Sequence, residues 1–494
     1  MFESAEIGHK IEKAIYKVEE PILREALLDA QYELKEHKDF PVVILINGVD
    51  GAGKGETVNL LNEWMDPRLI STCAFGSLSD EEEERPRMWR YWRALPAKGR
   101  IGILFGSWYT DPIIERVAGE IKASELHHQI DEIVRFEKML AHEGVLLLKF
   151  WFHLSKDKQK QRLEQLEKDP KTRWRVTEQD WQHFKQYDKF REVSESVLRE
   201  TSTAEAPWIV VEGEDANYRS LTVGKFILQE IKQRLAQKPK VMTQSDAAPL
   251  LPPIDNLQLL DTLDLDKSYS KKDYQEDLEK WQGKLNLLSR HPKFKEHSVI
   301  AVFEGNDAAG KGGSIRRITA ALDARQYTII PIAAPSEDER AQPYLWRFWR
   351  HIPRKGRFSI FDRSWYGRVL VERVEGYCQE HEWLRAYSEI NDFEEQLVEH
   401  GAIVVKFWLA ISKEEQLKRF QEREQIGFKR FKITEEDWRN RDKWDNYVHA
   451  VGDMVERTST DIAPWTLVEA NNKYYARIKV LKTLCEAIEK ALDV

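Results

Sequence analysis

Two stretches in the second half of the chain carry residues suited to phosphate chemistry. The first, VIAVFEGNDAAGKGGSIRRI (residues 299–318), places an apolar run before Gly305, Gly310 and Lys311 and a helical pattern after them. In this context the glycines let backbone N–H groups and a helix N-terminus surround phosphate oxygens, and the lysine reaches the transferred phosphate. The spacing predicts a phosphate-binding loop. The alternative is a glycine-rich turn without function.

The loop departs from the usual nucleotide-binding version, because Gly312, not Ser or Thr, follows the lysine. Asp307 lies inside the loop, where a carboxylate can hold Mg²⁺ against phosphates, since this cation prefers oxygen ligands and retained waters. We assign Gly312 and Ser314 to phosphate binding, the latter as a secondary hydroxyl contact. The alternative for Asp307 is a turn residue that hydrogen bonds to its own backbone.

The second stretch, FSIFDRSWYGRVLVERVEG (residues 358–376), delivers Asp362 at the end of an apolar strand. Parallel α/β sheets bind ligands at this edge, so we expect Asp362 to be a second metal-associated acid. Arg363 and Arg368 follow closely and are expected to clamp the phosphoryl group, whose developing charge the site must stabilise. The alternative for the arginines is surface salt bridges.

Between these stretches lies APSEDERAQPYLWRFWRHIPRKGR (residues 334–357), which predicts a mobile helical excursion. Its basic residues include Arg347, Arg350 and Lys355, which we assign to phosphate binding. Its two tryptophans share a face at helical spacing and are expected in the core. Such a lid would grip a highly anionic substrate and exclude water from the reaction.

The first half repeats the second without gaps at an offset of 364 − 107 = 257 residues. Its loop keeps an aspartate and a lysine, Asp50 and Lys54. Phe105 and Gly106, however, stand where the second half has its second acid and the arginine that follows. The first half thus lacks one of the two metal-associated acids, and we expect it to be catalytically inactive.

The repeat predicts two tandem domains, at residues 1–236 and 263–494, joined by a proline-containing linker at 237–262. Within each half, short apolar runs alternate with longer amphipathic ones, which is typical of parallel strands covered by helices. The expected fold class is therefore α/β, with two P-loop, kinase-like α/β/α domains that have parallel sheets and helical lids.

Composition excludes several classes of protein. The 494 residues are 41% apolar and 32% charged, typical of a globular protein, and no apolar run is long enough to span a bilayer. A formal charge of −8 argues against non-specific nucleic-acid coating. Three cysteines without a paired motif suggest neither a disulfide framework nor a thiolate metal site. The polar N-terminus has no secretory layout, so we expect a cytoplasmic location.

At these motifs the chain resembles the family 2 polyphosphate kinases, and more closely their two-domain members. The resemblance rests on EGNDAAGKGGSIRRI, YLWRFWRHIPRKGR and FDRSWYGRVLVERVEG, and covers nearly all of both halves. It implies reversible transfer of the terminal phosphoryl of inorganic polyphosphate to AMP, giving ADP, with Mg²⁺ as cofactor. The family's metal-associated aspartates map onto Asp307 and Asp362, its loop lysine onto Lys311 and its neighbouring arginine onto Arg363. The resemblance also favours a homo-oligomer.

Two alternatives stay open from the sequence. An ATP-dependent nucleoside or nucleotide kinase would share the fold, loop and lid and differ in its phosphate donor. A non-catalytic polyanion-binding protein could use the Arg-Trp segment of the lid. A pure binder, however, has no need for both loop-edge aspartates.

Overall fold

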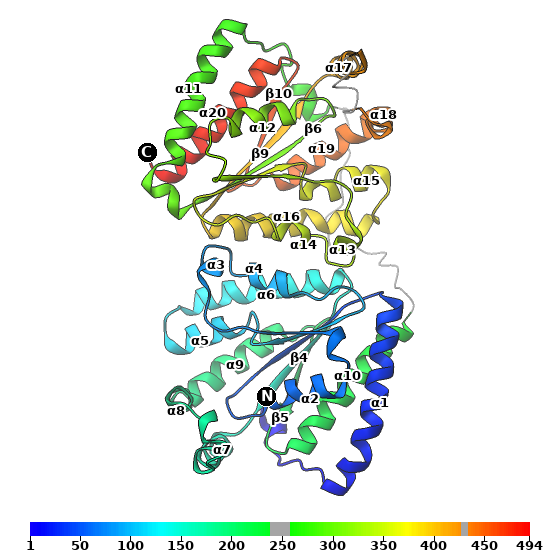
Figure 1. Ribbon diagram of the computed structural model, residues 1–494, viewed down its shortest axis with the longest axis vertical. Coiled ribbons are helices and arrows are strands. Elements are labelled where there is room, and N and C mark those ends of the chain that lie inside the picture. Colours follow the sequence, from blue (N-terminus) through cyan, green and yellow to red (C-terminus); the bar gives the residue numbers. More distant parts are fainter. Residues whose placement is uncertain (238–256, 426–432) are drawn as a thin grey trace. The chain divides into compact units, whose positions relative to one another are not determined.

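The computed structural model describes residues 1–237, 257–425 and 433–494. Each half of the chain forms one sheet of five parallel strands, and the two sheets have the same strand order. The order is β2-β3-β1-β4-β5 in the first half and β7-β8-β6-β9-β10 in the second. The predicted α/β class with parallel sheets is therefore confirmed (Figure 1).

The strands of the first half are β1 (Val42–Gly48), β2 (Ile70–Ala74), β3 (Ile101–Phe105), β4 (Leu146–His153) and β5 (Trp208–Glu212). Its helices are η1 (Glu3–Ala5), α1 (Lys13–His37), α2 (Lys54–Trp64), η2 (Pro67–Leu69), α3 (Asp80–Glu83), α4 (Trp89–Ala94), α5 (Thr110–Ala118), α6 (Ala123–His142), α7 (Lys156–Lys168), η3 (Arg173–Arg175), α8 (Glu178–Lys185), α9 (Tyr187–Thr201) and α10 (Ala216–Ala236).

The strands of the second half are β6 (Ser298–Gly305), β7 (Tyr327–Pro331), β8 (Phe358–Asp362), β9 (Ala402–Ala410) and β10 (Trp465–Glu469). Its helices are η4 (Leu259–Thr262), α11 (Lys271–Ser289), η5 (Pro292–Glu296), α12 (Lys311–Thr319), α13 (Glu337–Arg340), α14 (Trp346–Trp349), η6 (Trp365–Arg368), α15 (Val371–Glu375), α16 (Glu380–Glu399), α17 (Lys413–Gln425), α18 (Glu435–Asp442), α19 (Trp444–Thr458) and α20 (Lys473–Leu492).

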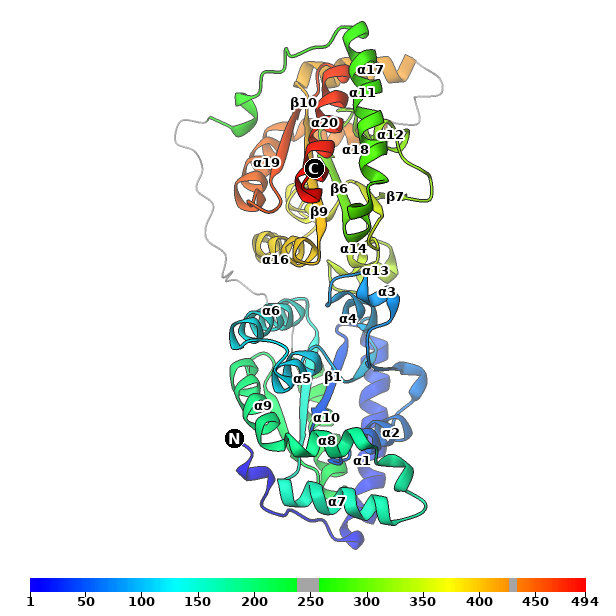
Figure 2. The same ribbon diagram turned by 90° about the vertical axis from the view of Figure 1, so that its left-hand side faces the viewer.

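Helices cover both faces of each sheet (Figures 1 and 2). In the second half, α11, α12 and α20 pack together on one face, while α16 and α19 pack on the other. The central strand β6 and its neighbour β9 are buried along nearly their whole length, which explains their continuous apolar sequence. Buried residues of α11, α12 and α20 pack against strands β6, β8 and β9 and form a hydrophobic core of this half.

The sequence repeats do not coincide fully with the compact units that contacts define. One unit comprises most of the first repeat together with Pro335–Trp346, and the other comprises most of the second repeat together with Ser79–Arg87. The domain boundaries expected from the sequence stay predictions. Most of the expected linker, at residues 238–256, lies outside the described residues. None of the described helices is both long and apolar enough to cross a membrane.

Candidate active site

The loop between β6 and α12 has the geometry of a phosphate-binding loop. Gly305 has φ 146°, and a Cβ there would lie 2.4 Å from the carbonyl oxygen of Leu409, so only glycine fits. Gly310 caps α12 in a left-handed conformation with φ 109°. Lys311 opens the helix, and its Nζ donates to the carbonyl oxygens of Gly305 at 2.8 Å and Asn306 at 3.4 Å. The ammonium group thus lies within the loop, as the motif predicts.

The two predicted aspartates lie at the same edge of the sheet. Strands β6 and β8 are paired, with Phe303 opposite Asp362, so β8 ends beside the start of the loop. Within the loop, Asp307 accepts hydrogen bonds from Arg363 at 3.2 Å and from Asn440 at 2.8 Å. Both carboxylates and the first arginine therefore converge on the loop that holds Lys311.

A third acid, Glu304, belongs to this cluster and was missed by the sequence reasoning. It is the penultimate residue of β6, is buried, and accepts a hydrogen bond of 2.8 Å from the Ser364 hydroxyl. Burial raises the pKa of Glu304, and that hydrogen bond and the nearby cations Lys311 and Arg363 offset the rise only in part. The available signal was an acid at the end of an otherwise apolar strand.

Residues far along the chain support the loop from outside. Arg419 on α17 donates to the carbonyl oxygens of Ala308 and Ala309, and Gln416 Nε2 donates to that of Asp307 at 3.1 Å. The mixed-charge stretch at 418–447 thus contributes Arg419 and Asn440 to the site. Its basic residues Lys429, Arg430 and Lys432 lie outside the described residues.

Two residues of the site adopt backbone conformations that favour glycine. Ala308 in the loop and Arg363 after β8 both have φ 65°. At the equivalent positions of the first half stand Gly51, with φ 78°, and Gly106, with φ 72°. A non-glycine residue in this left-handed backbone conformation destabilises the folded protein by about 1–2 kcal/mol. Such strained residues are found most often at functional sites. The second half therefore keeps strained side chains where the first half has none.

The remaining predicted phosphate-binding residues are not all brought to the loop. Arg368 forms an ion pair of 2.7 Å with Glu372 and is mostly buried. Arg347 is buried and donates to the carbonyl oxygen of Ala333 at 2.9 Å. Arg350 lines a cavity at the amino-terminal end of β8, the edge opposite Asp362.

The other three members of the predicted set lie on α12 or in the excursion. Ser314 is buried and Gly312 half-buried in α12, while Lys355 is half-buried in the segment before β8. The phosphate-binding roles of the whole set stay predictions. Of the two tryptophans expected in the core, Trp349 is fully buried and Trp346 is half-buried.

The first half keeps the loop but lacks the paired acid. Phe105 ends β3 opposite Ile46, at the register where Asp362 ends β8. Lys54 Nζ donates to the carbonyl oxygen of Gly48 at 2.5 Å and contacts Asp50 at 3.3 Å. No carboxylate therefore ends β3, as the sequence indicates, and the next acid along the chain is Asp111 in the first turn of α5.

The Ser-Trp-Tyr motif shared by both halves has a structural role. Trp365 and Tyr366 donate to the buried carboxylate of Glu394 at 3.0 and 2.7 Å, and Lys406 pairs with the same group at 2.7 Å. Burial lowers the pKa of Lys406 and raises that of Glu394, and the ion pair opposes both shifts. The first half has the same network around Glu137. The lysines in β4 and β9 therefore each have a buried partner.

The loop, its lysine and the aspartates at the carboxyl edge of a parallel sheet have the arrangement expected of a P-loop phosphotransferase. The family model for Polyphosphate kinase 2 (PPK2) matches residues 10–239 and 268–493. The chain belongs to this family, and both halves are copies of its domain.

Curated relatives match the whole chain. A polyphosphate:AMP phosphotransferase of Pseudomonas aeruginosa is 62% identical over 99% of both chains, and one of Pseudomonas syringae pv. tomato is 59% identical over 99% of both. A polyphosphate:AMP phosphotransferase of Acinetobacter johnsonii is 37% identical over 94% of this chain and 96% of its own. A crystal structure assigned to polyphosphate kinase 2 of Pseudomonas aeruginosa PA01 superposes with a TM-score of 0.91 at 59% identity, covering 100% of this chain and 99% of the other.

Proposed function

We propose that the protein transfers the terminal phosphoryl group of inorganic polyphosphate to AMP, giving ADP. The observation that carries this proposal is the 62% identity, over 99% of both chains, to a polyphosphate:AMP phosphotransferase. Asp307, Lys311, Asp362 and Arg363 are all present in the second half, which supports the proposal and is the reason why catalysis is proposed for that half.

In this function the loop residues neutralise and orient the end of the polyphosphate chain. Backbone N–H groups at the start of α12 and the ammonium of Lys311 bind phosphate oxygens. Arg363 stabilises the charge that develops on the transferred phosphoryl group. The attacking oxygen belongs to the phosphate of AMP, which is already ionised, so it needs little help from a general base. Because one phosphoanhydride replaces another, the reaction is expected to be reversible.

The donor set of the site suits Mg²⁺. This cation usually takes one or two carboxylates and completes its coordination with substrate phosphates and water. Among the described residues there is no cluster of three or more metal-ligating side chains, and the half-buried Asp362 accepts a hydrogen bond from the Ile332 N–H through its backbone carbonyl oxygen, not its carboxylate. Asp307 and Asp362 would hold the ion, which when bound neutralises phosphate charge and orients the transferred group. The cytoplasmic location and a homo-oligomeric state stay predictions.

The test is ADP formation from AMP and long-chain polyphosphate with Mg²⁺ and no ATP. We expect turnover by the unmodified chain, its loss with EDTA, and its loss in Lys311→Ala. Lys160→Ala, which removes an exposed cation from α7, serves as the charge-matched control and should retain turnover. If ADP forms only when ATP is supplied, the protein is an ordinary nucleotide kinase. Binding of polyphosphate without turnover would favour the non-catalytic alternative.

A further inference from the structure

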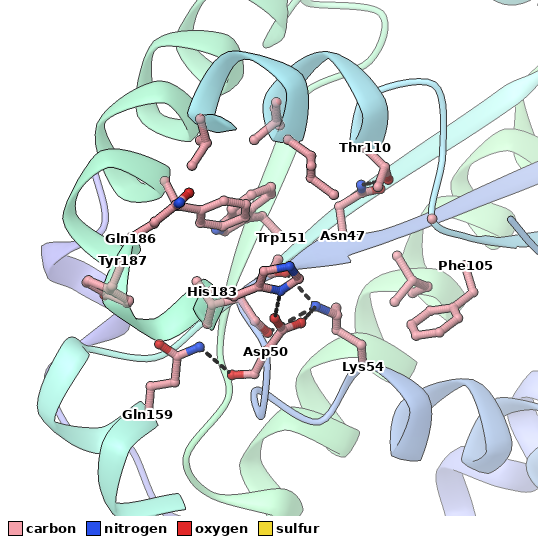
Figure 3. A pocket seen from close by; sticks show the side chains of 18 of the residues that line it. Asn47, Asp50, Lys54, Phe105, Thr110, Trp151, Gln159, His183, Gln186 and Tyr187 are labelled. Carbon is pink, nitrogen blue, oxygen red and sulfur yellow. Dashed lines mark hydrogen bonds and ion pairs between the residues drawn. The ribbon is translucent and has the colours of Figure 1, made fainter. Parts of the chain in front are cut away.

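The first half contains a cavity of about 410 Å³ beside its phosphate-binding loop. Its wall runs from the loop residues after β1 to α5, α8 and the start of α9. Figure 3 shows Asp50, Lys54 and His183 grouped on one side, with Phe105 and Trp151 among the side chains around them. All of its lining residues belong to the same compact unit. The catalytic role proposed for the second half does not use this cavity.

The lining has lost the charges that the second half carries at equivalent positions. At an offset of 257 residues, Asn47, Phe105, Gly106, Ala118, Gln182 and Gln186 replace Glu304, Asp362, Arg363, Glu375, Arg439 and Lys443. The six residues of the first half all line the cavity. Three acids and three bases are thus replaced by amides, an aromatic ring and small residues. This wall no longer suits a metal ion or a chain of phosphates, each of which needs several charges.

The first half retains one cationic group that could bind a phosphate. Lys54 opens α2, an 11-residue helix, at the end of a loop with the same glycine spacing as in the second half. His183 Nδ1 lies 2.9 Å from Asp50, where the second half has Asn440. Burial works to raise the pKa of Asp50, but Lys54 and His183 outweigh it and hold that pKa well below its ordinary value. Lys54 and the N–H groups at the start of α2 are therefore the groups that would contact a phosphate, while His183 pairs with Asp50.

A buried polar atom on the wall lacks a partner. Gln159 is 3% exposed and lines the cavity, and its Nε2 donates to the carbonyl oxygen of Asp50 at 3.0 Å. Its Oε1 has no hydrogen-bond partner among the described residues. The equivalent Oε1, of Gln416, accepts a hydrogen bond of 3.2 Å from Arg441, whose position the first half fills with Phe184. A buried acceptor without a donor is unfavourable, and a ligand hydroxyl or amino group would satisfy it.

We propose that this cavity is a non-catalytic binding site for a nucleoside monophosphate. The phosphate binds at Lys54 and the N-terminus of α2, and the base and sugar occupy the apolar and amide-lined part of the cavity. This inference does not rest on the proposed function, because it concerns binding in the half that lacks the second acid.

The chemistry of the wall selects this class of ligand. Small-molecule sites are mostly apolar with a few polar groups, and occupy about 300–1,000 Å³. Phe75, Phe105, Trp151 and Phe190 offer aromatic surface for a planar base, while the side-chain amides offer hydrogen bonds to its edge. The single cation of Lys54 matches the single phosphate of a nucleoside monophosphate. A polyphosphate chain would leave most of its charges unpaired against such a wall.

The proposal is tested by counting AMP bound to the full-length chain by equilibrium dialysis, without polyphosphate so that no turnover occurs. Lys54→Ala removes the ammonium group and is expected to weaken AMP binding to the first-half site about tenfold or more. Ala118→Trp places a large ring at the exposed end of α5, where it would obstruct the cavity. We expect the unmodified chain to bind one more equivalent of AMP than either variant, and Lys160→Ala to match the unmodified chain.

Competitors then test the class of ligand. Adenosine and orthophosphate should each displace the additional equivalent less well than unlabelled AMP, because each supplies only part of the ligand. Equal numbers of bound AMP in all four proteins would overturn the proposal. So would displacement by tripolyphosphate or orthophosphate at lower concentrations than AMP, which would indicate a site for inorganic phosphates. ADP formation is measured separately on the same preparations, so failure of the proposed function leaves this count unaffected.

Discussion

Replacing Arg363 by glycine should separate stability from activity, because the residue combines a strained backbone with a functional charge. Its φ of 65° favours glycine, and the equivalent residue of the first half is Gly106. Its guanidinium contacts Asp307 at 3.2 Å and Glu436 at 3.8 Å. Arg363→Gly and Arg363→Ala lose the same ion pairs, so the difference in stability between the two variants depends on the backbone conformation alone.

The expected difference follows from two opposing contributions. A Cβ in the left-handed region costs about 1–2 kcal/mol. Glycine loses about 0.4–1 kcal/mol relative to alanine through the greater freedom of its unfolded chain. Arg363→Gly should therefore be more stable than Arg363→Ala by about 1 kcal/mol. For a unit of this size that corresponds to about 2–4 °C in melting temperature.

Thermal unfolding followed by circular dichroism measures this difference, and the same pair of changes at Arg316 provides the control. Arg316 is exposed within α12, where glycine is about 1 kcal/mol worse than alanine, so the order of the two variants should reverse. Both Arg363 variants should lose about 100- to 1,000-fold in turnover. If Arg363→Gly melts no higher than Arg363→Ala, backbone strain at this position is refuted. If turnover survives, the arginine does not act on the phosphoryl group.

Three further results are expected. Asp362→Asn should lower ADP formation about 100-fold or more, while Asp111→Asn in the first half should change it less than about twofold, as steady-state kinetics would show. Lys406→Met should cost about 3–5 kcal/mol in urea unfolding because it leaves Glu394 buried without its cation, and a second change, Glu394→Gln, which keeps an acceptor for Trp365 and Tyr366, should restore part of the loss; a stable single variant would contradict this. Burial raises the pKa of Glu304 in the folded protein above its ordinary value of 4.5. The contribution of Glu304 to the free energy of unfolding is therefore fully present below pH 4.5 and is lost as pH rises through the raised pKa. Glu304→Gln should therefore melt higher than the unmodified chain at pH 7, with a difference that shrinks towards pH 4, and a constant difference would argue against titration.

Most of the fold could be predicted from the sequence because its central strands are buried on both faces. Continuous apolar runs predict β1, β3, β4 and β5 and their repeats. Strands β2 and β7, at one edge of each sheet, were missed, because three of the five residues in each are exposed. Strands β5 and β10, at the other edge, have no exposed residue and keep an apolar sequence that could be recognised.

The site was predictable where a motif is local, and not where folding brings distant residues together. Asp307 and Lys311 lie in one loop, and Asp362 ends a recognisable strand. Asn440 and Gln416, however, follow the loop by more than 100 positions and reach it only through α17 and α18. The sequence of a charged helix does not indicate which distant residue an amide side chain on it will contact. The sequence alone therefore indicated the groups proposed to contact substrate and left out those that hold them.

The differences between the two halves form a set that is consistent only when taken together. In the second half, Asp307 and Arg363 neutralise each other, so each charge depends on its neighbours. A lone carboxylate at Phe105 would face a wall without that arginine, and burial would then oppose its ionisation. An arginine at Gly106 would meet the left-handed backbone, and Asp50, the equivalent of Asp307, already pairs with Lys54 and His183. The first half therefore lacks both the charge and the strain, and with Phe105 in the place of Asp362 it has a cavity lined mainly by apolar and amide side chains beside a loop with the same glycine spacing.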